Sequence, residues 1–281
     1  MNESGHPPLA PSPLRVVLAW AVHLYTAMGL VCAAGMAVLI VHGEAADFRQ
    51  AFWLMFLATV IDASDGTLAR LVRIKEVLPG FDGRKLDELT DFLTYVALPL
   101  LLIWKAKLLP AGTEVTLLLP LLAGAYGFCQ VEAKTDNGYF LGFPSYWNLI
   151  AFYLYVLQPL PGWLSLTLLI VPALLTFVPS LYFYPSQKGF VNRLSCVLGL
   201  PWAVLMAWVL WRLPDAAADD PQGRQLALWS LAYPIYYLAG SWVVTGLLWR
   251  DRYRRTRCGG EAPPQQPASV AAGTPTPSPS S

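Results

Sequence analysis

Charged residues are scarce in this chain. They make up only 13% of its 281 residues, whereas 56% are hydrophobic. This composition excludes most soluble domains and indicates a protein that resides in a lipid bilayer. The 19 basic and 18 acidic residues nearly cancel. The net charge therefore points to no nucleic-acid partner, and only the placement of the charges is informative.

Cysteine is also rare, and the four cysteines lie far apart at positions 32, 129, 196 and 258. This spacing predicts neither a disulfide framework nor a zinc site, and favours small core residues. The chain lacks an internal repeat, and it lacks a glycine-rich nucleotide loop of the Walker or dinucleotide type. A nucleotide-containing substrate would therefore have to be bound in another way.

Long apolar runs are what the sequence has instead. The first is too long for a signal-peptide core and is expected to be a retained membrane helix. Most of the others reach the roughly 20 residues that cross the hydrocarbon, although the fifth is short and is joined to the sixth through Pro159 and Pro161. We expect an all-α, polytopic membrane protein with about eight transmembrane helices, at 15–41, 50–72, 86–106, 114–133, 145–160, 162–184, 191–213 and 225–249.

The basic residues indicate how such helices would be oriented. With both termini in the cytoplasm, the outer side keeps only five of the 19 basic residues, and the inner side takes the rest. This asymmetry follows the positive-inside rule. The outer five are Arg49, Lys105, Lys107, Arg212 and Arg224.

The two ends of the chain differ from its body. Residues 1–13 are rich in proline, and residues 259–281 consist mostly of Gly, Pro, Ala, Ser, Thr and Gln. We expect a disordered N-terminus over 1–13, one transmembrane domain over 14–250, and a basic and then disordered tail over 251–281.

Four aspartates lie within or at the ends of apolar helices, where a carboxylate costs several kcal/mol unless it is paired, hydrated or bound to a metal. Asp62 and Asp65 are spaced i, i+3, and Asp87 and Asp91 are spaced i, i+4, so each pair shares a helix face. Both pairs are expected at the same cytoplasmic level. Converging carboxylates favour divalent cations, and oxygen ligands favour magnesium or manganese.

A two-metal cluster at this level could clamp a diphosphate and leave one carboxylate as the base for an alcohol nucleophile. Gly66 and Ala69 would keep the helix face shallow for a phosphate, and Arg70 could reach it. Two alternatives remain open from spacing alone: a sodium or proton relay in a transporter, and a structural ion-pair network with nearby arginines.

The whole string resembles a known signature. From Asp62 the chain reads D-A-S-D-G-T-L-A-R, then twelve residues, then G-R-K-L-D-E-L-T-D. This is similar to the signature D-x2-D-G-x2-A-R-x8-G-x3-D-x3-D of the CDP-alcohol phosphotransferase family at every fixed position. The gap of twelve rather than eight residues resembles the variant in the bacterial phosphatidylcholine synthase branch, as do the expected helix number and the length.

The resemblance implies a bacterial inner-membrane enzyme whose active site faces the cytoplasm, and which transfers a phosphatidyl group from CDP-diacylglycerol to an alcohol, with release of CMP. It implies two manganese or magnesium ions, and it allows a homodimer. By the same resemblance, the metal ligands are Asp62, Asp65, Asp87 and Asp91, with Asp91 as the candidate general base. The residues implied to line the CDP pocket are Gly66, Ala69, Arg70 and Gly83.

The acceptor alcohol also needs a binding surface. A choline acceptor needs an aromatic surface for its trimethylammonium group, which cannot donate a hydrogen bond. The segment 134–148 is dense in aromatic residues and resembles the same branch, so Tyr146 and Trp147 are predicted to help form a choline site. Alternatively, these rings are interfacial anchors. Serine, glycerol phosphate and inositol phosphate remain the alternative acceptors.

Overall fold

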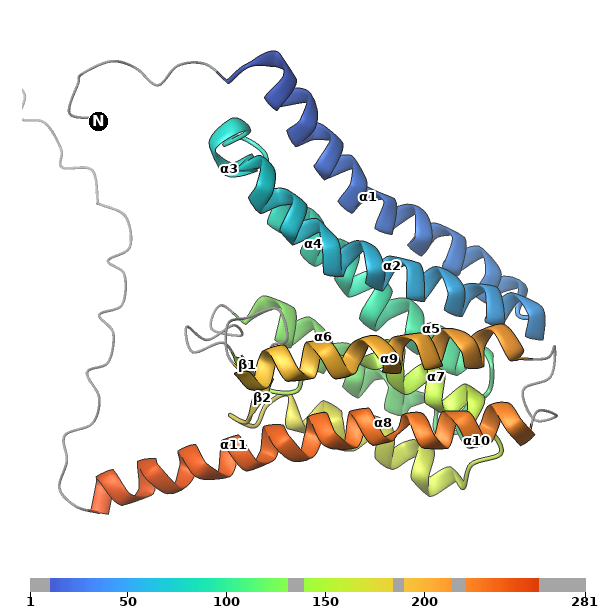
Figure 1. Cartoon of the computed structure of the whole chain (residues 1–281). Coiled ribbons are helices and arrows are strands. Elements are labelled where there is room, and N and C mark those ends of the chain that lie inside the picture. The colour runs from blue at the N-terminus through green and yellow to red at the C-terminus, as the bar shows by residue number, and fades with distance from the viewer. Residues whose placement is uncertain (1–10, 131–138, 184–189, 214–220, 258–281) are drawn as a thin grey trace, which may run out of the picture.

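The structure is a computed structural model that describes residues 11–130, 139–183, 190–213 and 221–257. Of the predicted tails over 1–13 and 251–281, residues 1–10 and 258–281 lie outside the described residues. The described part is almost entirely helical (Figure 1). This confirms the predicted all-α class, with one short two-stranded antiparallel sheet added to it.

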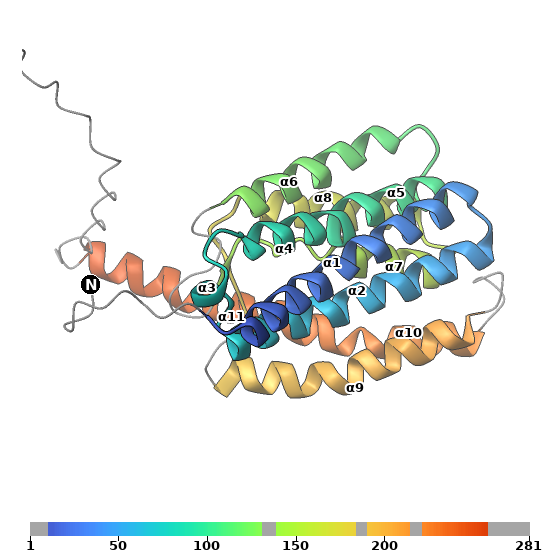
Figure 2. The ribbon, with the colours of Figure 1, turned by 90° about the horizontal axis from the view of Figure 1, so that it is seen from above.

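The first two helices form an antiparallel pair. Helix α1 (Pro13–His42) and helix α2 (Ala45–Val72) lie side by side along most of their length (Figures 1 and 2). The turn between them needs Gly43, whose φ of +78° favours glycine and whose N–H donates to the Leu39 carbonyl. Glu44 and Asp47 then form a capping box that starts α2.

The twelve-residue gap after Arg70 is an ordered connection. Helix α2 ends at Val72, Arg73 follows it in the left-handed conformation, and the short helix α3 (Ile74–Val77) comes next. Ile74 and Val77 are buried against Ala19 and Val22 of α1. This connection therefore packs against the N-terminal part of α1.

The next helical run is continuous from 83 to 105 but changes its geometry twice. Helix α4 (Gly83–Asp91) passes into the π-helix η1 (Phe92–Ala97) and then into α5 (Leu98–Lys105). Asp82 caps the start, because its side chain accepts hydrogen bonds from the backbone N–H groups of Arg84 and Lys85. This cap fixes where the helix that carries Asp87 and Asp91 begins.

The remainder of the chain builds the other side of the molecule (Figure 1). Strands β1 and β2 pair antiparallel, with Tyr139 opposite Phe183. This two-stranded sheet thereby joins two segments that are far apart in the sequence. The elements in order are η2 (Glu114–Leu117), α6 (Leu118–Cys129), β1 (Tyr139–Leu141), α7 (Trp147–Val156), α8 (Gly162–Leu175), β2 (Leu181–Phe183), α9 (Phe190–Arg212), α10 (Pro221–Ser230) and α11 (Ala232–Arg257).

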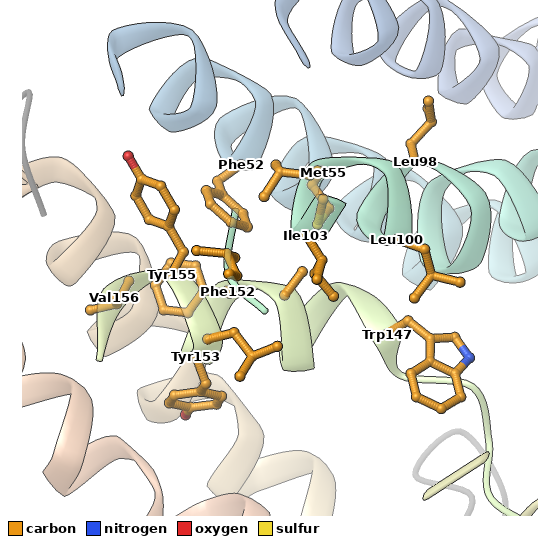
Figure 3. Close-up of a cluster of buried hydrophobic side chains, with 14 of the residues drawn as sticks. Phe52, Met55, Leu98, Leu100, Ile103, Trp147, Phe152, Tyr153, Tyr155 and Val156 are labelled. Atoms are coloured by element: carbon orange, nitrogen blue, oxygen red, sulfur yellow. The ribbon is translucent and has the colours of Figure 1, made fainter. Parts of the chain in front are cut away.

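Helix α7 lies at the centre of the apolar core. Eight of its ten residues are buried, and Figure 3 shows Phe152 and Tyr155 beside Phe52 of α2, whereas Tyr153 points to the opposite side of the helix. An apolar helix buried on all sides belongs to the interior of a large bundle. Helix α7 therefore holds the helices of the first half against those of the second half.

The predicted spans are confirmed in part. Among the residues that the structure describes, four helical stretches are long and apolar enough to cross a membrane: α1, α2, Asn192–Arg212 of α9, and Pro221–Arg250 of α10 and α11. This is the architecture of a multi-pass membrane protein. The run 83–105 matches the predicted span 86–106.

The fourth, fifth and sixth predicted spans are shorter than expected. The described helices there cover Glu114–Cys129, Trp147–Val156 and Gly162–Leu175. Helix α8 ends before Pro179, which has no N–H to continue a helix, and β2 follows it. The number of eight spans and the cytoplasmic position of both termini remain predictions.

Candidate metal centre

Three of the four predicted aspartates meet in space. Asp62 on α2 and Asp87 and Asp91 on α4 each place one carboxylate oxygen within 4.8 Å of the others. All three residues are half-buried. Like charges at this separation repel strongly in a poor dielectric, and a cation between them would remove that cost.

Helix geometry explains how the three carboxylates meet. Asp87 and Asp91 lie one turn apart on one face of α4, which is the i, i+4 arrangement that the sequence predicted. The η1 segment that follows packs against α2 and brings that face toward Asp62. The donor set of three carboxylates fits a hard divalent cation such as Mg²⁺ or Mn²⁺.

Asp65 lies apart from this group of three. It is only 7% exposed, and its Oδ2 accepts a hydrogen bond of 2.7 Å from the Thr26 hydroxyl of α1. The i, i+3 spacing predicted that Asp65 and Asp62 share a helix face, and the two residues do lie about one turn apart on α2. The contact with α1 explains how its carboxylate is accommodated at this depth.

A residue that the sequence analysis did not single out also reaches the site. The Tyr95 hydroxyl, on η1, donates a hydrogen bond of 2.7 Å to Asp62 Oδ2. Tyr95 follows Asp91 by four residues, so the helical spacing was a signal that could have identified it. No comparable spacing exists for Thr26, because it lies on a different helix 39 residues away from Asp65.

The residues predicted to line the CDP pocket lie on two helix ends beside the carboxylates. Gly66 is half-buried, and a Cβ there would come within 3.4 Å of Arg70 Nη1. Arg70 itself is exposed, and its Nη2 donates to the Thr67 hydroxyl at 2.9 Å. Ala69 packs against the small apolar cluster between α1 and α3. Arg70 is therefore the polar group of this set that can reach a ligand.

Gly83 occupies a tight position at the start of α4. A Cβ at Gly83 would overlap the imidazole ring of His23. That ring is buried beside Phe81 and Trp20, with centroid distances of 4.4 and 5.9 Å. Among the described residues, no group hydrogen-bonds its Nε2. Glycine is required here because α1 approaches the backbone of α4 closely.

Tyr146 and Trp147 belong to an aromatic cluster at the start of α7. Trp147 is fully buried, with its ring 5.6 Å from that of Phe143. The half-buried Tyr146 has its hydroxyl 3.4 Å from the hydroxyl of Tyr237 on α11. Tyr237 in turn donates to the Phe183 carbonyl on β2 at 2.8 Å. The cluster is therefore assembled from three distant parts of the chain.

Comparison with known proteins identifies the family. The chain is 34% identical over 246 residues to the phosphatidylcholine synthase of Pseudomonas aeruginosa, an alignment that covers 86% of this chain and 96% of that protein. It is 43% identical over 149 residues to the phosphatidylcholine synthase of Legionella bozemanae, which covers 52% of this chain and 68% of the relative. The corresponding enzyme of Legionella pneumophila is 39% identical over 177 residues, or 62% of this chain and 68% of the relative. This chain belongs to the phosphatidylcholine synthase family.

Membership of the phosphatidylcholine synthase family agrees with the sequence resemblance and with the acidic site. No family model matches the chain, so membership rests on these relatives. Within the family framework, the ordered α3 insertion explains why the longer gap between Arg70 and Gly83 is compatible with the site. Asp62, Asp87 and Asp91 still converge across it.

Proposed function

We propose that this chain transfers the phosphatidyl group of CDP-diacylglycerol to choline, giving phosphatidylcholine and CMP. The observation that carries the proposal is the convergence of Asp62, Asp87 and Asp91, in a chain that belongs to the phosphatidylcholine synthase family. A carboxylate cluster among apolar helices is a functional feature by default, because its cost must be offset by something that it binds.

The reaction needs a base for the acceptor hydroxyl. We assign this role to Asp91, which would accept the choline O–H proton while the choline oxygen bonds to the phosphorus of the diacylglycerol phosphate. The bond from that phosphorus to the oxygen of the CMP phosphate breaks, and CMP leaves with the bonding electron pair. Asp62, Asp65, Asp87 and Asp91 would hold two Mn²⁺ or Mg²⁺ ions. When bound, these ions supply positive charge to the diphosphate.

The nucleotide part of the substrate would lie over Gly66, Ala69, Arg70 and Gly83. The exposed guanidinium of Arg70, one turn beyond Gly66, is suited to a bidentate contact with a phosphate. Gly66 lacks a side chain that would stand between the backbone of α2 and the ligand, whereas Gly83 lets the start of α4 pack directly against His23. In this proposal, a shallow helix surface binds the nucleotide in place of a glycine-rich loop.

Choline would be recognised by aromatic faces, since its trimethylammonium group has no hydrogen to donate. We assign Tyr146 to this surface because it is half-buried, at the edge of the aromatic cluster. Trp147 is fully buried. Its role in the choline site would therefore be to support the ring of Phe143, which lies between Trp147 and Tyr146.

The active site would face the cytoplasm of a bacterium, across its inner membrane. Basic residues gather at the inner ends of α2 and α4, at Arg70, Arg73, Lys75, Arg84 and Lys85, as the positive-inside rule expects. We retain eight spans with both termini inside. Helices α7 and α8 would then cross with irregular segments at their ends, covered by the surrounding protein.

The test is CMP release by the purified full-length protein in detergent. CDP-diacylglycerol and Mn²⁺ would be supplied with choline, serine, glycerol phosphate, inositol phosphate or no acceptor. Release with choline alone supports the proposal, and chelation of the metal should abolish it. Release with a different acceptor would retain the acidic site and remove the choline assignment. No release with any acceptor, from monodisperse protein, would overturn the proposed reaction.

A further inference from the structure

Asp62 and Asp65, the two proposed metal ligands on α2, share a feature that the proposed reaction does not use. Each has one carboxylate oxygen held by a hydroxyl from a neighbouring helix. Tyr95 of η1 donates to Asp62 Oδ2, and Thr26 of α1 donates to Asp65 Oδ2, both at 2.7 Å. Hydrogen bonds of this length from a hydroxyl to a carboxylate are charge-assisted and about twice as strong as neutral ones.

Tyr95, which contacts Asp62, lies in a π-helical segment and not in a regular α-helix. The π-helix begins at Phe92, directly after Asp91, and ends at Ala97. Pro99 contributes to this change, because it has no N–H for the Tyr95 carbonyl and its ring would clash with that carbonyl in a regular α-helix. Single π turns inside α-helices occur frequently at functional sites.

The contact of Thr26 is buried more deeply. Thr26 and Asp65 are each 7% exposed, so water contributes little to solvating this carboxylate. Close packing between α1 and α4 supports the position of Thr26. One turn further along α1, Gly29 lies so close to Thr90 that a Cβ would overlap the threonine methyl group. The helix that carries Thr26 is therefore held firmly against the acidic site.

We propose that Tyr95 and Thr26 are positioning residues that fix the Asp62 and Asp65 carboxylates for a divalent cation. This inference rests on the proposed function, because it requires a cation at the acidic site. A hydrogen bond to one oxygen restricts the rotation of the carboxylate and thereby pre-organises the other oxygen. Partners of this kind typically change metal affinity or activity by about 10- to 100-fold.

The same helix pair offers a matched control. The Tyr25 hydroxyl lies 2.8 Å from the Ser64 hydroxyl, between α1 and α2. Tyr25 and Ser64 are the sequence neighbours of Thr26 and Asp65, yet their contact involves no carboxylate. Removing the Tyr25 hydroxyl therefore reproduces the loss of an interhelical hydrogen bond without touching a proposed metal ligand.

The experiment measures Mn²⁺ binding directly, by electron paramagnetic resonance of free Mn²⁺, on full-length protein in detergent without substrate. We expect Tyr95→Phe to weaken binding by about tenfold or more, and Tyr25→Phe to change it by less than about twofold. Thr26→Val should weaken binding in the same way as Tyr95→Phe, whereas Thr26→Ser, which keeps the hydroxyl, should restore it. Thermal unfolding in the absence of metal would identify variants that are merely destabilised.

The Mn²⁺ affinities of the wild type and the variants test the metal site and the positioning role separately. If the wild-type protein binds no Mn²⁺, the metal site of the proposed function fails. If the wild type binds and Tyr95→Phe binds equally well, the positioning role of Tyr95 is overturned while the metal site stands. If Tyr95→Phe does not remain monodisperse, the Thr26→Val and Thr26→Ser pair decides. Equal Mn²⁺ affinity in those two variants overturns the inference.

Discussion

The acidic site and the aromatic cluster are built in opposite ways. At the acidic site, α1, α2 and η1 are connected by hydroxyl-to-carboxylate hydrogen bonds, such as those from Thr26 and Tyr95. In the aromatic cluster, ring packing dominates, as between Phe143 and Trp147 or between the stacked rings of Tyr182 and Tyr237. The first region keeps polar groups hydrogen-bonded inside the bundle, and the second region removes apolar surface from its surroundings.

This difference explains why the meeting of the aspartates could be predicted from the sequence, whereas the contacts of the aromatic cluster could not. Asp62, Asp87 and Asp91 lie within 30 residues on α2 and α4, and helical spacing places Asp87 and Asp91 on the face that meets Asp62. The aromatic cluster joins Tyr146 to Tyr237, which are 91 residues apart. It is formed by the packing of α7, β2 and α11, and no local pattern predicts such a contact.

The largest effect is expected at the acidic site. Asp91→Asn removes the proposed base and one charge from the group of three carboxylates, while it keeps the size of the side chain. We expect CMP release to fall by about 10²- to 10⁴-fold, with little change in the thermal stability of the protein. Steady-state kinetics with CDP-diacylglycerol and choline checks this, with Glu76→Gln on the exposed side of α3 as the charge control. A variant that retains more than about a tenth of the activity would contradict the role of Asp91.

The second prediction concerns the aromatic cluster. Trp147 has no exposed surface, so Trp147→Ala should destabilise the protein by about 3–5 kcal/mol through lost contacts and the resulting cavity. Unfolding in detergent, followed by the loss of monodisperse protein on heating, measures this. The matched control is Trp163→Ala, because the Trp163 side chain is 68% exposed. Equal destabilisation by both variants would show that Trp147 is not a core residue.

An intermediate effect is expected where α1 meets α4. Gly83→Ala should cost about 1–3 kcal/mol of stability and should weaken CDP-diacylglycerol binding, because the new methyl group overlaps the His23 ring. Gly80→Ala is the control, since a Cβ at Gly80 meets nothing within 4 Å. In a double-mutant cycle, His23→Ala should relieve the overlap and recover part of the loss. Independent, additive effects of the two substitutions would contradict the contact.

A smaller effect is expected at the edge of the aromatic cluster. Tyr146→Ala should raise the KM for choline by about 2- to 30-fold, which corresponds to the loss of one cation–π contact, and should leave the KM for CDP-diacylglycerol unchanged. Tyr146→Phe keeps the ring and loses only the 3.4 Å contact with the Tyr237 hydroxyl. It should therefore behave nearly as the wild type. A choline KM unchanged in Tyr146→Ala would remove this residue from the acceptor site.

Local sequence patterns and tertiary packing each determine a different part of the acidic site. Hydropathy predicted the all-α membrane class, and helical spacing predicted the meeting of Asp62 with Asp87 and Asp91. Helical spacing did not predict the hydrogen bond between Asp65 and Thr26, because the position of α1 beside α2 depends on tertiary packing. Nor did it predict the π-helix at Phe92, whose register depends on Pro99 and on the contacts of Tyr95.

Segment lengths were the other source of error. The run 162–184 is apolar throughout, so periodicity alone could not place the end of α8 at Leu175 or the start of β2 at Leu181. The pairing of β2 with β1 satisfies backbone groups that a continuous helix would have satisfied internally. Pro179 was the available signal for this break.

The smallest effect is expected at Glu88, directly beside Asp87 on α4. The two carboxylates are adjacent in the sequence but differ in surroundings, because Asp87 joins the group of three while Glu88 pairs with Arg84 on the surface at 3.5 Å. The Arg84 side chain is 77% exposed, and exposed pairs at i, i+4 contribute only about 0.3–0.5 kcal/mol. Glu88→Gln should therefore change stability by less than about 0.5 kcal/mol and leave both Mn²⁺ affinity and CMP release within about twofold of the wild type. Glu88→Gln could instead reduce Mn²⁺ affinity as strongly as Asp87→Asn. That result would show that the overall negative charge of α4 attracts the cation, and it would contradict a specific site formed by the three converging carboxylates.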